Sequence, residues 1–439
     1  MIARIDARTA DGRRALETLR AALGVERGMV SGGAAVEGAE ADVRRIVEDV
    51  RRRGDAAVCE WTNRFDRSSL APKDLRVPEE AIEAAYRAQA PEFIETVARV
   101  RESVRAFQRH ILSRNPPALK RGGRTLRLVY RALSRVGLYV PGAKAFYPST
   151  VLMTAVPALA AGVPSVAVAA PPTADGDIHP GVLATCRISG IHEVYRMGGT
   201  PAVAAFAYGT QTVRPVEKVA GPGNRYVQLA KKLVYGQVDI DSLAGPSEVI
   251  VLADSSADPR LAAADLLAQA EHDPGSAILV TPDETLAEAV LDELEAQVEA
   301  LDRAEAIRSA LARYSAVVLV ADLVEAVRVV NAFAPEHLQI VAADAEAVLR
   351  DVRAAGAVFL GRWTPVAVGD YVAGPSHALP TGGTARWASG LTANDFLKTM
   401  SVIEYAEGAL AEDAGDIERL ARVEGLTAHA ESVLKRLAP

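Results

Sequence analysis

The sequence has few cysteines and no long apolar run, and each shortage excludes a class of protein. Among its 439 residues there are only two cysteines, Cys59 and Cys186, and neither belongs to a CxxC pair, so a disulfide framework is excluded. No apolar run reaches about 18 residues, the length that a membrane-spanning helix needs. The first residues, MIARIDARTADGRR, lack the apolar stretch of a signal peptide. We therefore expect a cytoplasmic, soluble protein with no membrane contact.

An excess of basic residues is also absent. The chain has 49 Lys and Arg against 56 Asp and Glu, which gives a net charge of −7, and the basic residues form no stripe, so we expect no nucleic-acid partner. Aromatic residues make up only 5 %, but the 49 % of hydrophobic and 24 % of charged residues are typical of a globular chain with a core. The length favours roughly two to four domains.

Helical periodicity dominates the first part of the chain. Segment 36–54, VEGAEADVRRIVEDVRRRG, has apolar residues three and four positions apart, and segment 78–111 repeats this pattern with an interruption at Pro91. Such spacing predicts amphipathic helices that bury one face. Segment 414–437 has the same character, whereas 362–391 is rich in Gly and Pro and is expected to be loop.

Short apolar runs alternate with helical stretches in the rest of the chain. A first series contains VGLYVPG (136–142) and SVAVAA (165–170), with a helical pattern at 149–162 between them. The runs of the second series are EVIVLAD (248–254), AILVT (277–281), AVVLV (316–320) and AVFLG (357–361). Continuous apolar strands that alternate with helices predict parallel sheets covered on both faces. The expected fold class is therefore α/β, with two doubly wound, Rossmann-like domains plus helical N-terminal and C-terminal extensions.

An acid and a base, Glu336 and His337, stand side by side in the apolar context NAFAPEHLQI (331–340). Charged residues are seldom buried without a partner, and a general acid/base pair needs a partly dry setting that tunes its pKa values. The same dipeptide also fits an ordinary surface feature at the entry to a strand. On its own, this pair leaves both interpretations open.

Segment 258–272, DPRLAAADLLAQAEH, predicts a helix that brings two metal-ligand types together. Asp258 fits an N-cap and Pro259 a first-turn position. Gln269 and His272 are then three residues apart on one face of the last turn, where a carbonyl oxygen and an imidazole can chelate a divalent metal. A histidine there can equally complement the negative end of the helix dipole.

Three further ionisable residues lie in the last quarter of the chain. Asp370 follows the apolar run PVAV, and a carboxylate at the end of a strand is where open α/β sheets put ligand groups, although an Asp beside Gly is also ordinary turn chemistry. Glu424 and His429 would point about 140° apart on one continuous helix. They converge only if the helix restarts at Gly425 and Thr427. Gln, His, Asp and His side chains together suit zinc or a neighbouring metal.

The residues alone thus indicate an α/β enzyme with an acid/base pair and candidate metal ligands. No GxGxxG loop is present, and GPGN matches only half of such a loop. Taken together, however, several segments resemble the histidinol dehydrogenase family, in the family's order from about residue 30 to the end of the chain. The matching segments are GLYVPG (137–142), YPSTVLM (147–153), GPGN (221–224), AGPSEV (244–249), QAEH (269–272), APEHL (334–338), GDY (369–371), HALPTGG (377–383) and GLTAH (425–429).

The resemblance implies the oxidation of L-histidinol to L-histidine through an aldehyde, which forms the last steps of histidine biosynthesis. This four-electron reaction uses two NAD⁺ in sequence. His337 would take the proton from the alcohol as hydride leaves, and it would be the base again in the second oxidation. Glu336 would activate the water that attacks the aldehyde. Two half-reactions need two bases at one carbon, and a loop can aim neighbouring side chains together where a strand would point them apart.

The resemblance also implies one Zn²⁺ per subunit and a homodimer with shared active sites. Gln269, His272 and Asp370 would bind the metal, and His429 would come from the partner subunit. The imidazole and amine of the substrate would complete the coordination, so the metal would orient the substrate. Glu424 matches the position that binds the substrate's amino group. The substrate-binding residues carried over from the family are Ser149, Ser247, Gln269, His272, His337, Asp370, Glu424 and His429.

Three positions match the nucleotide contacts of the family. Tyr139 and Asn224 match in residue type. At the third position the family commonly has a glutamine after a Gly-Gly pair, whereas this chain reads GGTPA and has Pro201. Proline has no side-chain donor, so the contact is lost or replaced by another group.

The strand series and the resemblance together predict a division of the chain. We expect residues 1–31 to form an N-terminal helical extension. Residues 32–138 and 246–391 would form the first Rossmann-like domain, with the catalytic and metal residues. Residues 139–245 would form the second, with the nucleotide contacts, and 392–439 a tail that reaches the partner subunit.

Two other functions compete with this prediction. A paralogue that oxidises another polar alcohol, such as a sulfonated diol, should have lost the amine-binding acid, and this chain retains Glu424. An inactive homologue that only binds a metal or nucleotide would not need its catalytic pair. Glu336, His337 and all four expected metal ligands are present, which argues against that reading.

Overall fold

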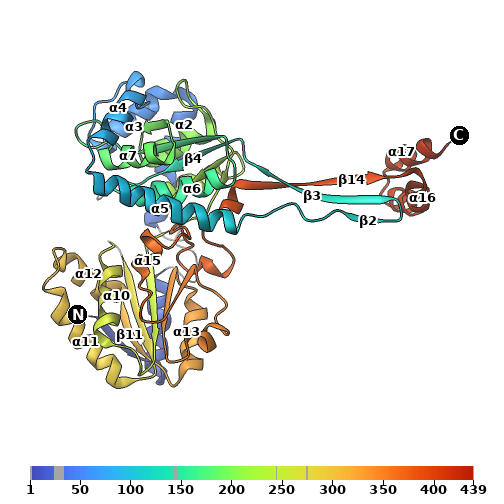
Figure 1. The fold of residues 1–439 in the computed structure, drawn as a ribbon. Helices are drawn as coiled ribbons and strands as arrows, with labels where there is room; N and C mark the ends of the chain where they lie inside the picture. The colour runs from blue at the N-terminus through green and yellow to red at the C-terminus, as the bar shows by residue number, and fades with distance from the viewer. Residues whose placement is uncertain (1, 24–33, 143–145, 244, 273–274, 439) are drawn as a thin grey trace.

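Two parallel sheets form the centres of two α/β lobes, and a long arm extends away from them (Figure 1). The computed structural model describes residues 2–23, 34–142, 146–243, 245–272 and 275–438. In this part of the chain, no helix is long and apolar enough to span a membrane. The expected fold class, two doubly wound domains with parallel sheets, is confirmed.

The first lobe contains a five-stranded sheet. Its strands are β4 (Arg135–Tyr139), β5 (Ser165–Ala170), β6 (Glu193–Arg196), β7 (Lys218–Ala220) and β8 (Asp239–Ile240). All neighbours are parallel, in the order β6-β5-β4-β7-β8, so the chain winds outward in both directions from its first strand. The helices of this lobe are α2 (Ala34–Arg53), α3 (Asp55–Asp66), α4 (Glu79–Arg87), α5 (Pro91–His110), α6 (Pro148–Ala160), α7 (Pro180–Ser189), α8 (Gly199–Tyr208) and α9 (Arg225–Val234). Buried residues of α2, α3, α8 and α9 share one core, and those of α4, α6 and α7 share the other.

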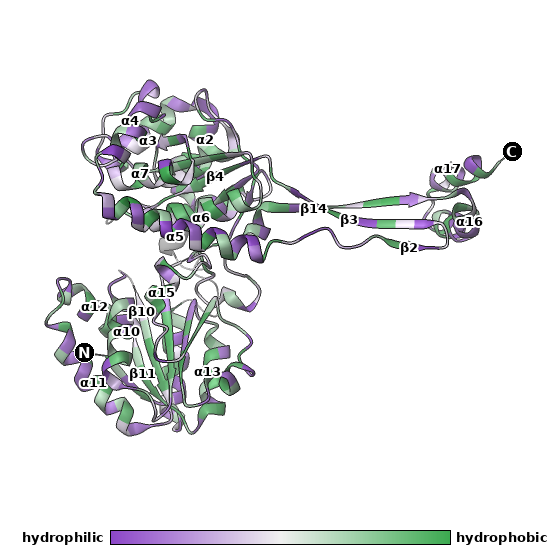
Figure 2. Cartoon of the chain, in the orientation of Figure 1, coloured by the Kyte–Doolittle hydropathy of each residue, from purple (hydrophilic) through white to green (hydrophobic). Residues whose placement is uncertain are grey.

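The second lobe contains a six-stranded sheet. Its strands are β1 (Ala3–Asp6), β9 (Glu248–Ala253), β10 (Ser276–Thr281), β11 (Ala316–Leu319), β12 (His337–Val341) and β13 (Ala357–Leu360), in the order β1-β11-β10-β9-β12-β13. Without β1, this order repeats that of the first lobe. The helices are α1 (Ala10–Ala22), α10 (Pro259–Ala270), α11 (Glu284–Val298), α12 (Ala304–Tyr314), α13 (Leu323–Phe333), α14 (Ala345–Leu349) and α15 (Val366–Tyr371). Apolar residues concentrate in the strands of both sheets (Figure 2), as covered parallel sheets require.

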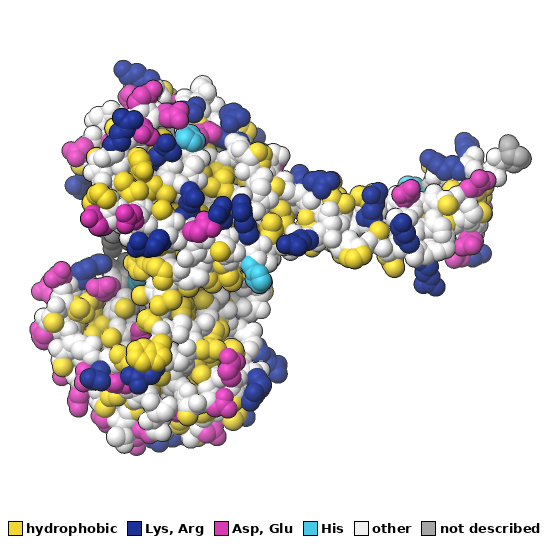
Figure 3. All heavy atoms as spheres, in the orientation of Figure 1, with side chains coloured by type: hydrophobic (Ala, Val, Ile, Leu, Met, Phe, Trp, Pro, Cys, Tyr) yellow, Lys and Arg dark blue, Asp and Glu magenta, His cyan; other side chains and the backbone are white. Residues whose placement is uncertain are grey.

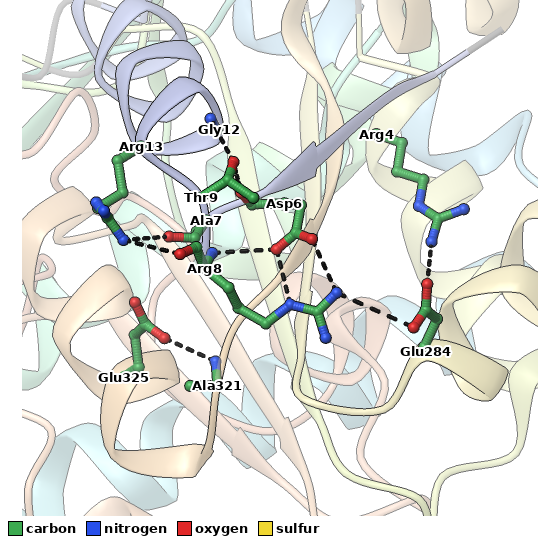
Figure 4. A network of polar contacts seen from close by, with 10 residues as sticks. All are labelled: Arg4, Asp6, Ala7, Arg8, Thr9, Gly12, Arg13, Glu284, Ala321 and Glu325. Carbon is green, nitrogen blue, oxygen red and sulfur yellow. Dashed lines mark hydrogen bonds and ion pairs between the residues drawn. The ribbon is translucent and has the colours of Figure 1, made fainter.

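The first residues of the chain form an edge strand, which the sequence did not reveal. We expected a helical extension, but β1 pairs with β11 and its Ile5 is buried. Arg4 donates to Glu284 on α11 at 2.6 Å, and Thr9 accepts from the N–H of Gly12 to cap α1 (Figure 4). Four residues are too few for periodicity to distinguish a strand, so only the pairing with β11 makes it recognisable.

The division of the chain also differs from the expected one. We grouped 32–138 with 246–391, but Val43 of α2 lies in the same buried cluster as Phe206 of α8, so these N-terminal helices cover the five-stranded sheet. The helix α4 likewise packs on α7. Helical periodicity identifies an apolar face, but it does not say which sheet that face will cover.

The arm is an antiparallel ribbon with two helices at its far end (Figure 1). It contains β2 (Leu119–Arg121), β3 (Arg124–Ala132), β14 (Leu397–Tyr405), α16 (Glu407–Val423) and α17 (Thr427–Leu437). β3 and β14 pair over nine residues, from Leu397 opposite Ala132 to Tyr405 opposite Arg124. Strands of this length span about 30 Å. Three short 3₁₀ turns complete the described elements: Pro72–Asp74, Thr384–Arg386 and Ala393–Phe396.

Candidate active site

Two neighbouring strands of the six-stranded sheet begin at the centre of the site. Glu336 directly precedes β12, His337 is its first residue, and Glu248 is the first residue of the adjacent strand β9. All three are buried. The chain reverses its winding direction between β9 and β12, but ligands of open α/β sheets usually bind at the carboxyl ends of the strands there. This cluster instead occupies the amino ends.

Glu336 and Glu248 hold each other through reciprocal hydrogen bonds. The backbone N–H of Glu248 donates to Oε2 of Glu336 at 3.0 Å, and the N–H of Glu336 donates to Oε1 of Glu248 at 3.3 Å. The N–H of Gly382 also donates to that Oε1, at 3.0 Å. Burial raises the pKa of both carboxyl groups to about 8, and the Glu336 charge adds to the rise at Glu248. The carboxylate of Glu336 is therefore a stronger base than that of an exposed glutamate.

His337 has a free ring nitrogen. Its Nδ1 is 3.1 Å from the carbonyl oxygen of Glu248, which can only accept, so Nδ1 carries the proton. Its Nε2 is buried and has no hydrogen-bond partner among the described residues. Burial lowers the pKa of His337, although Asp370, 3.8 Å from Nε2, opposes this effect. The neutral ring thus presents an unprotonated nitrogen, as a general base must. Glu336 is also close, with Oε2 3.5 Å from Nδ1, so the two expected bases converge.

Gln269 and Ser247 extend this cluster toward α10. Gln269 is buried and donates from Nε2 to Oγ of Ser247 at 2.7 Å, and Ser247 forms a hydrogen bond with Glu336 that lowers the pKa of that carboxyl group. The amide oxygen of Gln269 is then the atom available to a cation. The helix begins as predicted, because Asp258 accepts from the N–H of Arg260.

His272 lies just beyond the end of α10, at the exposed rim of the cluster. The helix ends at Ala270, so His272 is not in its last turn, but its N–H still donates to the carbonyl of Gln269 at 3.2 Å. Loss of water around the ring lowers the pKa of His272, and the nearby His337 lowers it further. The negative charge of Asp370 raises it. These couplings put His272 within electrostatic range of both residues.

Asp370 reaches the site from a helix. We expected it at the end of a strand, but residues 366–371 form α15 with Pro365 as N-cap, so PVAV is not a strand. Its carbonyl oxygen is 3.0 Å from Nδ1 of His377, whose Nε2 is 3.3 Å from Oγ1 of Thr150. Thr150 lies in the first turn of α6, so this chain of contacts joins the two lobes. Ser149, the preceding residue of α6, is half-buried beside it.

Within the described part of the chain, the donor set at this cluster is incomplete for a metal. Among the described residues, no three His, Cys, Asp or Glu side chains come close enough to hold an ion. Gln269, His272 and Asp370 provide an amide oxygen, an imidazole and a carboxylate, a set that fits zinc but leaves a four-coordinate site short of one ligand.

The fourth expected metal ligand, His429, and the expected amine-binding residue, Glu424, lie on the two helices at the tip of the arm (Figure 1). Glu424 is the C-cap of α16, Gly425 has a left-handed φ of 72°, and α17 starts at Thr427 with Leu426 as its N-cap, so the helix does restart between Glu424 and His429. Glu424 and His429 are both exposed there. The ribbon holds them far from the His337 cluster of their own chain.

The expected nucleotide contacts gather at the carboxyl edge of the five-stranded sheet. Tyr139 ends β4, and its hydroxyl accepts from the N–H of Gly199 at 3.2 Å, at the start of α8. A Cβ on Gly221 would lie 2.1 Å from the carbonyl oxygen of Tyr139, and one on Gly223 would lie 2.4 Å from Val227. Only glycine allows this close backbone turn before a helix, which is a cradle suited to a pyrophosphate.

Asn224 and Pro201 each have a structural role at this edge. Oδ1 of Asn224 accepts from the N–H groups of Tyr226 and Val227 and so caps α9. The amide nitrogen of Asn224 takes no part in this cap. Pro201 is buried in the first turn of α8, where its missing N–H breaks no helical bond. Their nucleotide contacts stay predictions.

Sequence reasoning assigned no role to two residues of the cluster. Glu248 is in the quoted segment AGPSEV, but its function depends on the pairing of β9 with β12, which no local pattern reveals. His377 is the first residue of the matching segment HALPTGG, to which the sequence analysis gave no role. The segment that joins it to Asp370 was expected to be loop, where sequence spacing predicts no contact between two side chains.

Comparison with known proteins identifies similar chains. The family model for histidinol dehydrogenase matches residues 31–437. The chain is 51 % identical over 391 residues to the histidinol dehydrogenase of Rhodopirellula baltica, covering 89 % of this chain and 85 % of the relative. It is 47 % identical over 403 residues to that of Gloeobacter violaceus, covering 92 % and 91 %. The crystal structure of histidinol dehydrogenase from Elizabethkingia anophelis superimposes with a TM-score of 0.87 at 33 % identity and covers 93 % of each chain.

Proposed function

The chain belongs to the histidinol dehydrogenase family of NAD-linked oxidoreductases, and from this premise we propose how its residues divide the oxidation of L-histidinol to L-histidine. The single observation that carries the proposal is the buried pair Glu336 and His337, with 3.5 Å between a carboxylate oxygen and a ring nitrogen. The family membership expected from the sequence motifs is confirmed.

His337 is the base of both oxidations in this proposal. Its Nε2 takes the hydroxyl proton of the alcohol as a hydride leaves the same carbon, which gives the aldehyde. After water has added, Nε2 takes a hydroxyl proton of the aldehyde hydrate as the second hydride leaves, which gives the carboxylic acid. The unpartnered Nε2 and the lowered pKa of His337 support this role, because a neutral ring is ready to accept a proton.

Glu336 is the base of the hydration step between the two oxidations. Its carboxylate takes a proton from water as the water oxygen bonds to the aldehyde carbon, and Nε2 of His337 returns its proton to the former carbonyl oxygen, which gives the hydrate and frees Nε2 for the second oxidation. The raised pKa of Glu336 supports this role, and the N–H of Glu248 fixes the direction of the carboxylate. An exposed glutamate would be a weaker base at neutral pH.

Gln269, His272 and Asp370 would hold a zinc ion beside this pair, with His429 of another chain as the fourth protein ligand. When bound, the ion supplies a template that orients the imidazole and amine of the substrate. The neutral imidazole of His272 supports the proposal, since a metal needs an unprotonated ring nitrogen. Ser149, Ser247 and Glu424 would complete the substrate contacts, with Glu424 opposite the amino group.

The active site would be shared between two chains of a homodimer. The arm carries exposed apolar residues on its strands and helices (Figure 3), including Leu119, Ile403, Leu420 and Val423, and Val423 is 87 % exposed. Monomers rarely expose such surfaces, so they support docking against a partner. The incomplete metal donor set at the His337 cluster and the exposed His429 at the arm tip give the same indication.

NAD would bind at the carboxyl edge of the five-stranded sheet, and when bound it accepts the hydride in each oxidation. Tyr139, Asn224 and the backbone around Gly221 would contact it. The glycine cradle supports this location, because a Cβ at Gly221 or Gly223 would collide with the protein and keep a pyrophosphate away from the start of α9.

The competing function is oxidation of a different polar alcohol by the same bases. It needs a substrate without the amine that Glu424 would bind. We propose a direct test in which purified protein with Zn²⁺ and NAD⁺ is given L-histidinol, L-histidinal or a sulfonated diol, and absorbance at 340 nm is followed. Reduction of two NAD⁺ per L-histidinol is expected. Turnover of the diol alone would contradict the proposal.

A further inference from the structure

The carboxylate of Asp66 has no hydrogen-bond or ion-pair partner among the residues that the structure describes. Asp66 is the last residue of α3, and Arg67 after it adopts a left-handed φ of 54°, so the chain turns away and leaves the side chain half-buried. Asp66 forms no hydrogen bond or ion pair with any described residue. Burial raises its pKa to about 6. A half-buried carboxylate without donors is only partly hydrated, so a hydrogen-bond donor on a ligand would stabilise its charged form.

This carboxylate lies over the carboxyl edge of the five-stranded sheet. A Cβ on Gly198 would be 2.9 Å from its Oδ2 and 2.7 Å from Pro171. Gly198 follows β6 closely and Pro171 follows β5. The charge of Asp66 also contributes to the raised pKa of Tyr139, at the end of β4, although burial is the larger cause. Asp66 is therefore close to the ends of three adjacent strands.

The start of α8, although close, does not satisfy Asp66. Helix N-termini normally offer free N–H groups to a carboxylate. Here the N–H of Gly199 is donated to Tyr139, and Pro201 has none. The raised pKa of Asp66 agrees with this absence of N–H donors, because hydrogen bonds from such donors would have lowered the pKa.

Dinucleotide-binding folds use an acid at this place. A carboxylate near the end of the second strand accepts hydrogen bonds from the adenosine ribose and repels the 2′-phosphate of NADP. The second strand here, β5, ends with two alanines and then Pro171 and Pro172, so it supplies no acid. Asp66 brings a carboxylate to that edge from α3, outside the sheet.

We propose that Asp66 accepts hydrogen bonds from the adenosine ribose hydroxyls of NAD and selects NAD over NADP, an inference that rests on the nucleotide site of the proposed function. Arg196, the arginine at the end of β6, is held by Asp177 at 2.9 Å and by the carbonyl of Asp74 at 2.8 Å. It is therefore already engaged and does not offer a free charge to a 2′-phosphate.

The test measures the dissociation constants of NAD⁺ and NADP⁺ by calorimetry for the Zn²⁺-loaded protein and its Asp66→Asn and Asp66→Ala variants. Loss of a hydrogen bond to a charged group should weaken NAD⁺ about tenfold or more, and the preference for NAD⁺ over NADP⁺ should fall by a similar factor. Glu60→Gln is the matched control. It removes one negative charge from the same helix, where Glu60 is exposed and pairs with Arg53, and both constants should equal those of the wild type.

The outcomes separate this inference from the proposed function. Wild-type protein that reduces NAD⁺ with L-histidinol, together with unchanged NAD⁺ and NADP⁺ affinities in Asp66→Ala, would overturn the inference alone. A wild type without that activity would overturn the proposed function and this inference with it. Circular dichroism of each variant checks that affinity losses do not come from unfolding, and the Asn variant keeps the volume of the side chain.

Discussion

The two sheets of this protein share a strand order, but their candidate site residues lie at opposite edges. In the five-stranded sheet, Tyr139 and Gly221 gather at the carboxyl ends of β4 and β7, on either side of the point where the winding reverses. In the six-stranded sheet, Glu248 and His337 stand at the amino ends of β9 and β12, the corresponding strands. The carboxyl edge follows the general rule for open α/β sheets, and the amino edge departs from it.

The chemistry of each edge explains the difference. The carboxyl edge has glycines at close backbone turns before α9, where a side chain would occupy the space that an anion needs. The amino edge has buried carboxyl groups with raised pKa values and an imidazole with a lowered pKa, a combination suited to proton transfer. Strand order therefore determines where a crevice lies, whereas the residues at the strand ends determine its function.

The largest expected effects come from the amino edge. His337→Asn should slow both the oxidation of L-histidinol and the oxidation of supplied aldehyde by about 10²–10⁴-fold, the usual contribution of a general base. Glu336→Gln should slow only the second reaction, because only that reaction requires an activated water. Stopped-flow measurement of NADH formation from each substrate separates the two steps. If Glu336→Gln slows both equally, the division of labour is wrong.

The same two variants test whether the two sheet edges act as separate sites. Neither should change the dissociation constant of NAD⁺, since the nucleotide site would lie on the other lobe. A weakened affinity for NAD⁺ in His337→Asn would mean that the two edges do not act as separate sites.

A moderate effect is expected at the metal ligands. His272→Asn should weaken Zn²⁺ binding by roughly tenfold or more, because the site loses one of its few protein donors. The measurement is zinc content by atomic absorption after dialysis against a weak chelator. His192→Asn is the control, because His192 is exposed and its ring contacts only Glu79 among the described residues. Equal zinc content in both variants would remove His272 from the ligand set.

The smallest effect is expected at the carboxyl edge. Gly221 has a φ of 125°, and a Cβ there would lie 2.1 Å from the carbonyl oxygen of Tyr139, so Gly221→Ala combines strain with a collision. The strain alone costs about 1–3 kcal/mol, and each kcal/mol lowers Tm by about 2–4 °C in a domain of this size.

A matched glycine separates the two contributions. Gly236 has a φ of 99°, but a Cβ there meets no atom within 4 Å, so Gly236→Ala carries strain without a collision. Calorimetry should find the larger Tm loss in Gly221→Ala, and only that variant should weaken NAD⁺ binding while it keeps its zinc. If the two variants lose the same Tm and both bind NAD⁺ normally, the close turn at Gly221 has no role in the nucleotide site.

Sequence patterns predicted the elements better than their partners. The runs at 248–254 and 277–281 became β9 and β10, and Pro91 starts a new helix, because apolar periodicity and proline act locally. The strand β1 and the pairing of β3 with β14 were missed, since each depends on a partner far along the chain. Long-range pairing leaves little mark on a short segment.

The candidate site divides in the same way. Glu336 and His337 are adjacent in sequence, so the dipeptide made them candidates, and the family resemblance assigned their roles. Asp370 was found as a residue but assigned to a strand end, because the short helix α15 has an apolar run that looks like a strand. Asp66 and Glu248 escaped notice, since only the folded chain brings an isolated acid to a sheet edge.

In the proposed homodimer, the amino edge of one chain becomes an active site only when the arm of the partner chain docks on it. His337→Asn damages the sheet edge and His429→Asn damages the arm, so each variant alone should be inactive. In a mixed dimer, one site carries both lesions and the other carries neither. Mixed subunits, with heterodimers verified by native mass spectrometry, should recover about half of the wild-type activity per heterodimer. Verified heterodimers without any recovered activity would mean that His429 acts within its own chain, and the shared site would be wrong.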